Sequence, residues 1–535
     1  MKSHCYPFRQ IPHSSKLFLD YLDFLPSVQQ FYSRSPRFLE WAKDEAASIQ
    51  YPAERRAQVA AVLERQNKGW GAGAKTLENL DRFRSGACAL VTGQQVGLFG
   101  GPVFSIYKAL SAVKLAREAG KLGINCVPVF WLATEDHDLA EVDQTWIPGA
   151  DRRLQTFTSG AQGKPDAPVG TVTFGPEISD VVASTSALLG ESEWAKLLGE
   201  CYRSGENFGS AFAKLFTRIF SEFGVILLDG SDPALDKIAA PTYRSALERS
   251  SEITHSLLDR NRELESAGYH QQVRVTDTST LLFAMRDGMR IPIQQTNSGT
   301  FVIGEEEISR AELLRVASQS PESFSPNVLL RPVVQDYLLP TLAYVGGAAE
   351  VAYFAQAAVT YEVLLGRVSP VLPRFSATMV EIKIQALLEK NHLSATDAFQ
   401  GPETLRGVIG ERRLPPNLQS SFEHATAAVE RSMKAVRESI AQLDKTLIES
   451  AENAESKMIY QIANLRARAS RAELRHSEIV QRHAEALSNA LYPEKTLQER
   501  EFAGIYFLAK YGAEWMNGLL ENIHPDCLNH QIIEL

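Results

Sequence analysis

The strongest constraint on the fold of this chain lies in residues 87–133. Two short apolar runs, at 87–91 and 126–133, flank a glycine-rich turn and a segment at 103–119 whose apolar side chains recur at helical spacing. Uninterrupted apolar runs of this length are typical of strands that are covered on both faces. Strand, turn, helix and strand in this order form a βαβ unit, which predicts a parallel sheet with a right-handed crossover.

Later segments extend this α/β pattern. Residues 224–230 and 371–374 predict further buried strands, and residues 342–347 predict a strand that leads into a helix beginning at Ala348. Residues 280–303 alternate between apolar and polar, which predicts antiparallel strands joined by a hairpin turn at Asp287-Gly288. Additional helices are predicted at 53–66, at 75–83 and within 187–223, and a short strand at 171–174.

The C-terminal third predicts a coiled coil. Residues 417–492 contain neither Gly nor Pro. Apolar residues from Val429 to Leu447, including Met433, Val436, Ile440 and Leu443, step by four and three, and the same alternation returns from Met458 to Ile479. The two runs are 11 residues apart, so the register slips between them.

One long helix with a stutter and a hairpin of two helices both fit this slip. We favour the hairpin, broken near 444–446, because Thr446 and Glu449 match a capping box that follows Asp444. The hairpin serves either as a packed helical domain or as a dimerisation element. We favour dimerisation, because one narrow apolar seam usually needs a partner.

The domain organisation follows from these patterns. A length of 535 residues is compatible with about two to four domains. We predict an N-terminal helical segment at 1–85 and an α/β core at 86–380 with insertions near 150–223 and 255–320. The helical coiled-coil part is predicted at 381–535, with its hairpin near 417–492 and a helical tail.

Charge and targeting signals limit the function classes. With 55 basic and 64 acidic residues the formal charge is −9, which argues against a nucleic-acid protein with a broad basic surface. A small anionic ligand bound locally stays compatible with this charge. The sequence shows neither an apolar signal segment nor a stretch long enough to span a membrane, so we expect no membrane partner and a cytoplasmic location.

The five cysteines are scattered, odd in number and never form C-x-x-C. This pattern argues against a disulfide framework and against a cysteine-rich zinc site. Cys88 and Cys126 lie within apolar runs, and we expect both to be small buried side chains.

A glycine-rich turn follows the first strand of the βαβ unit. Its candidate ligand-binding residues are Thr92, Gly93, Gln94, Gln95, Gly97 and Gly101. Glycines allow close backbone approach, and the N–H groups at the start of the next helix can bind an anion. The turn matches neither G-x-G-x-x-G nor G-x-x-x-x-G-K-[ST], so the standard dinucleotide and P-loop signatures are absent. A tight turn that only packs the helix against the strand is the alternative interpretation.

An acidic stretch follows the second strand. It supplies the candidate catalytic residues Glu135, Asp136, His137 and Asp138. Carboxylates and an imidazole crowded at one strand end can provide a general base or ligands for Mg²⁺. The alternative is a solvated loop whose carboxylates cap a helix. Zinc fits less well because no second His lies close in the sequence, and no dedicated metal site is predicted.

Two further segments contribute candidate binding residues. Asn327 and Arg331 lie in the segment 325–336, where Arg331 can bind a carboxylate or phosphate in bidentate fashion or can form an ordinary ion pair. Residues 342–353 repeat the order of strand, glycine turn and helix seen in the first motif. They supply the candidates Tyr344, Gly346, Gly347, Glu350 and Tyr353, of which the last two share a helix face.

These segments together resemble the bacillithiol biosynthesis cysteine-adding enzyme family. The resemblance is carried first by residues 91–97, 101–102 and 106–109, the last of which contain Tyr107 and Lys108. It covers nearly the whole chain and thins at 150–270 and 385–445. The other matching segments are 128–131, 135–138, 325–332, 343–350, 372–374, 492–493 and 497–500.

The resemblance implies a Rossmann-like parallel-sheet core with connecting insertions, and a coiled coil that makes a homodimer. The implied reaction is the last step of bacillithiol synthesis, which joins the carboxyl group of L-cysteine to the free amine of glucosaminyl-malate. Because a carboxylate does not react with an amine until it is activated, we expect ATP and Mg²⁺ to be used. The H-x-G-H and K-M-S-K-S strings of class I synthetases do not occur here, so their adenylate chemistry is not transferred residue by residue.

The resemblance also suggests roles for the candidate residues. The turn at 92–101 would hold phosphate or carboxylate groups, with Tyr107 and Lys108 on the helix that follows. Arg331 and Arg374 are candidate clamps for the two malate carboxylates. Asp136, His137 or Asp138 would accept the amine proton or hold Mg²⁺. Glu350 would bind an ammonium group or sugar hydroxyls.

Two alternative functions remain at this point. One is an adenylyl- or nucleotidyltransferase that acts on another small acid with the same core. The other is a non-catalytic coiled-coil dimer whose α/β part binds a metabolite. Clustering of polar groups at two strand ends favours catalysis over sensing.

Overall fold

The computed structural model describes residues 1–149, 152–412, 414–475 and 478–535. The chain forms two compact units. The first contains residues 1–149, 155–377 and 499–531, and the second contains residues 150–154, 378–498 and 532–535. A segment near the end of the chain therefore belongs to the same unit as the N-terminal half.

The first unit is built on a parallel sheet of five strands in the order β13-β12-β2-β3-β6. In the register, Val91 pairs with Val129 and with Tyr344, and Trp131 pairs with Leu228. All seven residues of β3 are buried, so both faces of this strand are covered, as its apolar run predicts. The strands are β2 (Cys88–Gln94), β3 (Cys126–Leu132), β6 (Ile226–Asp229), β12 (Thr341–Gly346) and β13 (Val371–Pro373).

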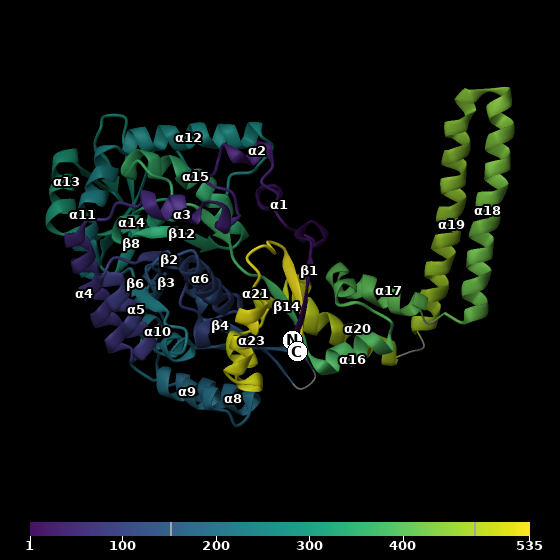
Figure 1. Ribbon diagram of the computed structural model, residues 1–535, viewed down its shortest axis with the longest axis horizontal. Coiled ribbons are helices and arrows are strands. Elements are labelled where there is room, and N and C mark those ends of the chain that lie inside the picture. Colours follow the sequence, from purple (N-terminus) through teal and green to yellow (C-terminus); the bar gives the residue numbers. More distant parts are fainter. Residues whose placement is uncertain (150–151, 413, 476–477) are drawn as a thin grey trace. The chain divides into compact units, whose positions relative to one another are not determined.

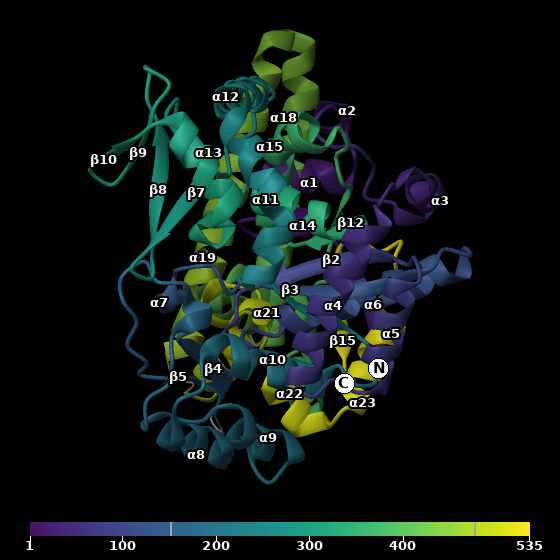
Figure 2. The same ribbon diagram turned by 90° about the vertical axis from the view of Figure 1, so that its left-hand side faces the viewer.

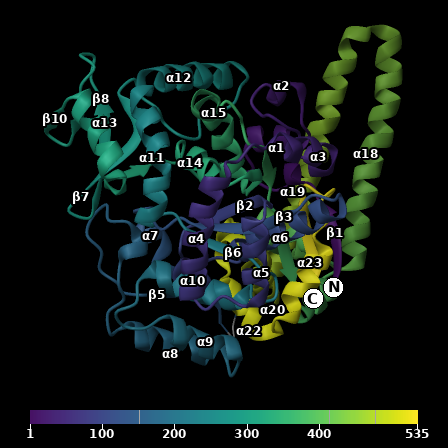
Figure 3. The same cartoon turned by 60° about the vertical axis from the view of Figure 1, so that its left-hand side comes forward.

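Helices surround this sheet (Figure 3). The crossover helix α6 (Phe104–Lys121) packs on β2 and β3, and α15 (Ala348–Leu365) follows β12. The predicted βαβ unit and the predicted strand-to-helix junction at Ala348 are thus confirmed. The N-terminal helices are α1 (Lys16–Leu22), α2 (Pro26–Gln29), α3 (Phe38–Ser48), α4 (Ala53–Gly69) and α5 (Ala74–Arg84).

A second sheet is inserted after α11 (Pro233–Glu248) and α12 (Ser250–Ser266). It is antiparallel, in the order β10-β9-β8-β7-β11, and lies beside α13 (Arg310–Gln319) in Figure 2. Asp287 and Gly288 join its first two strands with positive φ angles of 51° and 80°, which confirms the predicted hairpin turn. Its strands are β7 (Ser279–Arg286), β8 (Met289–Gln295), β9 (Phe301–Ile303), β10 (Glu306–Ile308) and β11 (Phe324–Pro326).

The expected strand at 171–174 is wrong. Residues Val169–Thr171 form a 3-10 turn, and Thr173 makes only an isolated bridge to Asn207. The segment packs instead against the loop after β3, where the Gly170 N–H donates to the Thr134 carbonyl at 2.9 Å. A β-propensity pattern without a neighbouring strand to pair with does not form a strand.

Most of the remaining elements of the first unit are helical. The predicted helices within 187–223 are present as the last part of α8 (Ile178–Leu189), α9 (Glu193–Cys201) and α10 (Phe208–Ile219). The others are β1 (Lys2–Tyr6), α7 (Leu139–Val142), β4 (Gln144–Pro148), α14 (Arg331–Leu338), α22 (Gly504–Tyr511), α23 (Glu514–Asn522) and all but the first residue of α21 (Gln498–Glu501). Three strands, β5 (Leu154–Thr158), β14 (Ala377–Val380) and β15 (His530–Glu534), have residues in both units.

One disulfide corrects the expectation drawn from the cysteines. Cys5 and Cys527 are bonded, with their Cα atoms 6.6 Å apart, and join the two ends of the first unit. The pair is 522 residues apart in sequence, so spacing could not indicate it. Cys126 is a buried free thiol as expected, whereas Cys88 is only partly buried.

The second unit contains the predicted hairpin (Figure 1). Helices α18 (Pro416–Leu443) and α19 (Ile448–Arg475) are separated by a 3-10 turn at Lys445–Leu447, which confirms the break near 444–446. The cap is Asp444, which accepts from the Thr446 N–H at 2.8 Å, rather than Thr446 itself. The other helices are α16 (Ile382–Lys390), α17 (Pro402–Arg412) and α20 (Glu478–Leu491). Among the residues described, no helix is both long enough and apolar enough to cross a membrane.

Candidate functional site

A cavity of about 260 Å³ lies at the carboxyl ends of the parallel strands. It sits where β2, β3, β12 and β13 each give way to a turn or helix, which is where open α/β sheets bind ligands. Its lining combines predicted and unpredicted residues. They are Gly93, Gln94, Gln95, Phe104, Lys108, Trp131, Ala133, Asp136, Glu141, Val328, Arg331, Tyr344, Gly347, Ala348, Ala349, Glu350, Tyr353, Arg374 and Arg500.

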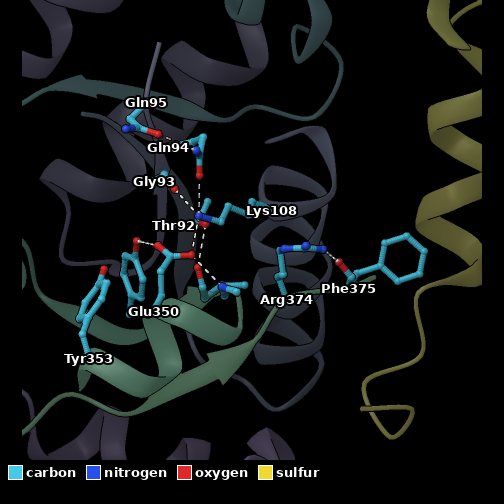
Figure 4. A network of polar contacts seen from close by, with 12 residues as sticks. Thr92, Gly93, Gln94, Gln95, Lys108, Glu350, Tyr353, Arg374 and Phe375 are labelled. Carbon is cyan, nitrogen blue, oxygen red and sulfur yellow. Dashed lines mark hydrogen bonds and ion pairs between the residues drawn. The ribbon is translucent and has the colours of Figure 1, made fainter. Parts of the chain in front are cut away.

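Lys108 is the centre of the polar network in this cavity (Figure 4). Its Nζ lies 2.8 Å from the Gly93 carbonyl, 2.9 Å from Gln94 Oε1 and 2.5 Å from Glu350 Oε2. Because an ammonium group has three donors, these contacts use all of them inside the protein. Lys108 therefore fixes the glycine turn and Glu350 in place rather than offering a free cation to a ligand.

Glu350 begins the second arm of the network. It accepts from the Tyr344 hydroxyl at 2.6 Å and from the Gly347 N–H at 2.7 Å, so it closes the first turn of α15. Burial opposes ionisation of Glu350, but Lys108 and these donors hold its pKa below the usual value. Burial lowers the pKa of Lys108, although Glu350 opposes that shift. A Cβ atom at Gly346 would lie 2.8 Å from Glu350 Cβ, which explains the glycine there.

One end of the cavity is acidic. The Gln95 amide Nε2 donates to Asp136 Oδ2 and to Glu141 Oε2, each at 2.8 Å. Asp136 Oδ1 accepts from the His137 N–H at 2.7 Å. Two carboxylates are thus held side by side by one amide, at the end of β3.

The other end is basic. Arg374 donates to Glu499 Oε1 at 2.6 Å and to the Phe375 carbonyl at 2.8 Å, and it lies over the Phe104 ring. Arg500 lies 6.0 Å from the centre of the same ring, and among the described residues no carboxylate pairs with it. The segment 499–531 thus brings a cation into a cavity whose other lining residues lie between 93 and 374.

Arg331 is a further cation that lines the cavity. Its guanidinium donates to the Tyr353 hydroxyl at 3.1 Å and to Gln335 Oε1 at 3.2 Å, and it lies near the rings of Trp131 and Tyr344. With Arg500 it faces the cavity without a hydrogen-bonded carboxylate among the residues described. These two cations, together with the start of α15 at Gly347, suit an anionic ligand.

The four predicted catalytic residues point in different directions. Asp136 lines the cavity, whereas Glu135 does not line it and accepts from Trp131 Nε1 at 3.2 Å. Burial raises the pKa of the Glu135 carboxyl, with Arg331 and Arg290 opposing. His137 faces Arg290 of the inserted sheet, and Asp138 caps α7 by accepting from the Glu141 N–H at 3.0 Å.

Several predicted binding residues serve the surrounding structure. Thr92 Oγ1 donates to the Val345 carbonyl at 2.8 Å and ties two strands together. Asn327 Oδ1 accepts from the Leu329 and Leu330 N–H groups before α14. The predicted residues that do not line the cavity are Thr92, Gly97, Gly101, Tyr107, Glu135, His137, Asp138, Asn327 and Gly346.

Sequence reasoning missed eight lining residues, which are Phe104, Trp131, Ala133, Glu141, Val328, Ala348, Ala349 and Arg500. Trp131 and Phe104 look like core residues in an apolar strand and helix, and Glu141 lies beyond the acidic stretch. Arg500 belongs to a segment that matched the family only as its ending. The sequence signal for Arg500 was its position next to Glu499 in that segment.

The acidic end also bears on the expected Mg²⁺. Among the described residues, no three His, Cys, Asp or Glu side chains gather as a metal site. Mg²⁺ commonly binds through one or two carboxylates together with phosphate oxygens of a substrate. The pair Asp136 and Glu141 fits that mode, and the basic end with the α15 N-terminus fits the phosphates of ATP.

Comparison with known proteins places these features in a family. Residues 1–375 match the family described as bacillithiol biosynthesis BshC, N-terminal Rossmann-like domain, and residues 377–535 match the BshC C-terminal coiled-coil domain. The chain is 46% identical to a protein of Koribacter versatilis over 99% of both chains, and 37% identical to one of Solibacter usitatus over 99% of both. A protein of Salinibacter ruber is 31% identical over 97% of this chain and 96% of its own.

All three relatives carry the name "Putative cysteine ligase BshC". The matches cover both parts of the chain and agree with the Rossmann-like sheet and the helical hairpin seen in the structure. The resemblance read from the turn at 92–101, the acidic stretch and the C-terminal seam is therefore confirmed, and this chain belongs to the bacillithiol biosynthesis BshC family.

Proposed function

We propose that this protein is a ligase that joins the carboxyl group of L-cysteine to the free amine of glucosaminyl-malate, with activation of the carboxyl group by ATP. The names of the relatives support the class of reaction. The observation that carries the proposal for this chain is that one cavity holds both kinds of charge. Arg331 and Arg500 line it without a hydrogen-bonded carboxylate among the described residues, and the carboxylates of Asp136 and Glu141 line it as well.

The two ends match the charges of the proposed substrates. The malate carboxylates and the phosphates are anions, for which the free guanidinium groups of Arg331 and Arg500 and the N–H groups at the start of α15 are suitable donors. The amine of the sugar is cationic before it reacts, and the carboxylates of Asp136 and Glu141 attract it. Binding both substrates in one cavity places the amine next to the activated carboxyl group.

The ligation forms one bond and breaks another. The amine nitrogen attacks the activated carboxyl carbon of cysteine, a C–N bond forms, and the C–O bond to the leaving phosphate or nucleotide breaks. We assign acceptance of the amine proton to Asp136, which lines the cavity. In the preceding activation, a carboxylate oxygen of cysteine bonds to a phosphorus of ATP and the P–O bond to the departing ADP or pyrophosphate breaks. Mg²⁺ would be held by Glu141 and would neutralise phosphate charge.

Lys108 and Glu350 have a supporting role in this scheme. Their ion pair fixes the Gly93 carbonyl on one side and the first turn of α15 on the other. The distance between the glycine turn and the α15 N-terminus is thereby held constant. A fixed cradle is what positioning of two reactants requires.

We also propose that the protein is a homodimer through the hairpin of α18 and α19. Within the described residues, large apolar side chains of this hairpin are exposed, among them Val436 at 42%, Leu443 at 83% and Leu465 at 59%. A second copy of the hairpin could cover them, as a seam of this kind requires. The cytoplasmic location expected from the sequence stays a prediction.

The ligase proposal is tested with purified protein, glucosaminyl-malate, L-cysteine, ATP and Mg²⁺, and the thiol product is sought by mass spectrometry. We expect product formation, dependence on ATP, and a rate at least about 100-fold lower for Asp136→Asn, the size typical of a lost general base. The control is Asp180→Asn, which removes an exposed carboxylate on α8 and is expected to act like the wild type. If no product forms although both substrates bind in calorimetry, the ligase proposal is wrong.

A further inference from the structure

A second cavity of the first unit lies against the disulfide between Cys5 and Cys527. Its volume is about 40 Å³, and Cys527 lines it whereas Cys5 does not. A space of this size holds about three water-sized groups, so a carboxylate fits into it. Its walls come from the segments 36–38, 111–115, 372–375 and 523–528. The proposed ligation gives Cys527 no role.

Lys114 of α6 supplies this cavity with a cation that has unused donors. Its Nζ donates to the Leu520 carbonyl at 3.3 Å, and Glu118 Oε1 lies 3.9 Å away, beyond hydrogen-bond distance. Glu118 accepts instead from Lys121 at 2.9 Å. An ammonium group has three donors, so two of those on Lys114 remain for a ligand.

The rest of the lining is compatible with an anion. Among the described residues that line this cavity there is neither Asp nor Glu. Arg374 lines it as well as the candidate site, but its guanidinium is bound to Glu499. Lys114 is therefore the cation that a carboxylate in this cavity can bind directly.

The two halves of the disulfide differ in their contact with water. Cys5 is exposed, whereas Cys527 is partly buried. When a thiolate opens a disulfide it attacks one sulfur atom, and the other sulfur leaves as a thiolate. Departure is easier for the sulfur whose negative charge water can solvate, and this sulfur is that of Cys5. Attack at Cys527 therefore has the better leaving group.

We propose that Cys527 is a site of thiol–disulfide exchange for a small thiol that carries a carboxylate, with the carboxylate bound by Lys114. The thiolate sulfur bonds to Cys527 Sγ, and the bond between Cys527 and Cys5 breaks. Its electron pair leaves on Cys5, which takes a proton from water. One disulfide replaces another, so no further oxidant or reductant takes part.

The exchange goes beyond the proposed ligation and does not depend on it. L-cysteine, the substrate proposed above, is a thiol with a carboxylate, and the proposed product is another. If the ligation takes place as proposed, the protein therefore meets thiols of this class. Exchange at Cys527 would then modify the chain next to Arg374, a residue of the candidate site.

The test compares mercaptoacetate, 2-mercaptoethanol and cysteamine, which are similar in length but are anionic, neutral and cationic. Full-length protein is incubated with each thiol in the absence of oxygen, free thiols are trapped with iodoacetamide, and peptide mass spectrometry locates the products. Each rate is divided by the thiolate concentration, because the thiolate is the attacking species. We expect the added thiol on Cys527 and the alkyl group on Cys5. Mercaptoacetate should react at least about fivefold faster than 2-mercaptoethanol, the effect of one opposite charge about 4 Å away in water.

The role of Lys114 is tested by Lys114→Gln, which should lose this preference for the anionic thiol. The matched control is Lys237→Gln, which removes an exposed lysine of α11 that does not line the cavity and should keep the preference. A high concentration of NaCl should weaken the preference in the wild type, because salt screens the charge of Lys114.

Four results would each overturn the proposal. They are the absence of an adduct, an adduct mainly on Cys5, equal rates for the three thiols, and an unchanged preference in Lys114→Gln. None of these measurements requires turnover. A failed ligase assay therefore leaves the exchange proposal standing, and a failed exchange leaves the ligase proposal standing.

Discussion

The buried imidazole of His530 makes the stability of the first unit depend on acid in a calculable way. His530 is fully buried, with Nδ1 2.8 Å from Ser376 Oγ, and burial lowers its pKa from 6.5 to about 4. Ser376 Oγ also donates to Glu499 Oε1 at 2.8 Å, the carboxylate that holds Arg374 at the cavity. Protonation of His530 would thus place a second cation beside a bonded, buried network.

Whether acid stabilises or destabilises the fold depends on which state binds the proton of His530. Between pH 6.5 and about 4 the unfolded chain binds a proton on His530 and the folded chain does not, so stability falls as the pH falls through this window. A difference of this size is worth about 3 kcal/mol, at 1.36 kcal/mol for each pKa unit. Below the folded pKa both states are protonated, and this contribution no longer changes with pH.

The measurement is the free energy of unfolding in urea at pH 7 and at pH 4 for the wild type and for His530→Asn. Asparagine keeps a hydrogen-bonding group near Ser376 but does not titrate. We expect the variant to lose about 3 kcal/mol less than the wild type between these two pH values. Equal losses in the two proteins would refute the reasoning.

Two other predictions concern the network and the hairpin. Lys108→Met should destabilise the protein by about 3 kcal/mol, because it leaves the Glu350 carboxylate enclosed without its cation. Lys108→Met with Glu350→Gln should cost less than the sum of the single changes in urea unfolding, whereas additive costs would mean that the pair is not coupled. Val436→Glu with Leu443→Glu should give a monomer in light scattering, because both side chains are exposed on the hairpin; a persistent dimer would place the interface elsewhere.

The elements that the sequence could predict are those whose signal is local. The apolar run at β3 predicts a buried strand, and the glycines after β2 predict a turn, from neighbouring residues alone. The same holds for the hairpin turn at Asp287-Gly288. Residues 171–174 have the composition of a strand but lie against Thr134, and strand formation depends on a neighbour that the sequence does not show. The bond between Cys5 and Cys527 is likewise a consequence of the fold of the whole unit.

The candidate site shows the same limit at the level of single side chains. Parallel topology correctly placed Gly93, Asp136 and Gly347 at one edge of the sheet, because all parallel strands end there. It could not show that the side chains of successive residues after β3 diverge. Glu135 bonds to Trp131, and His137 contacts Arg290 of the inserted sheet. Beyond the last paired residue of β3, the direction of each side chain depends on contacts with residues that are far away in the sequence.

Which charged side chains of the cavity can bind a ligand depends on the partners that each already has inside the protein, and composition does not show those partners. Lys108 has all its donors bound inside the protein, and Arg374 is held by Glu499, so neither contributes a free cation in spite of lining the cavity. Arg331 and Arg500 keep donors available for an anion, and Arg500 comes from the far end of the chain. A net charge of −9 is therefore compatible with an anionic ligand, because guanidinium groups that lack a hydrogen-bonded carboxylate act at close range, whereas the distant field of the other charges is screened by salt.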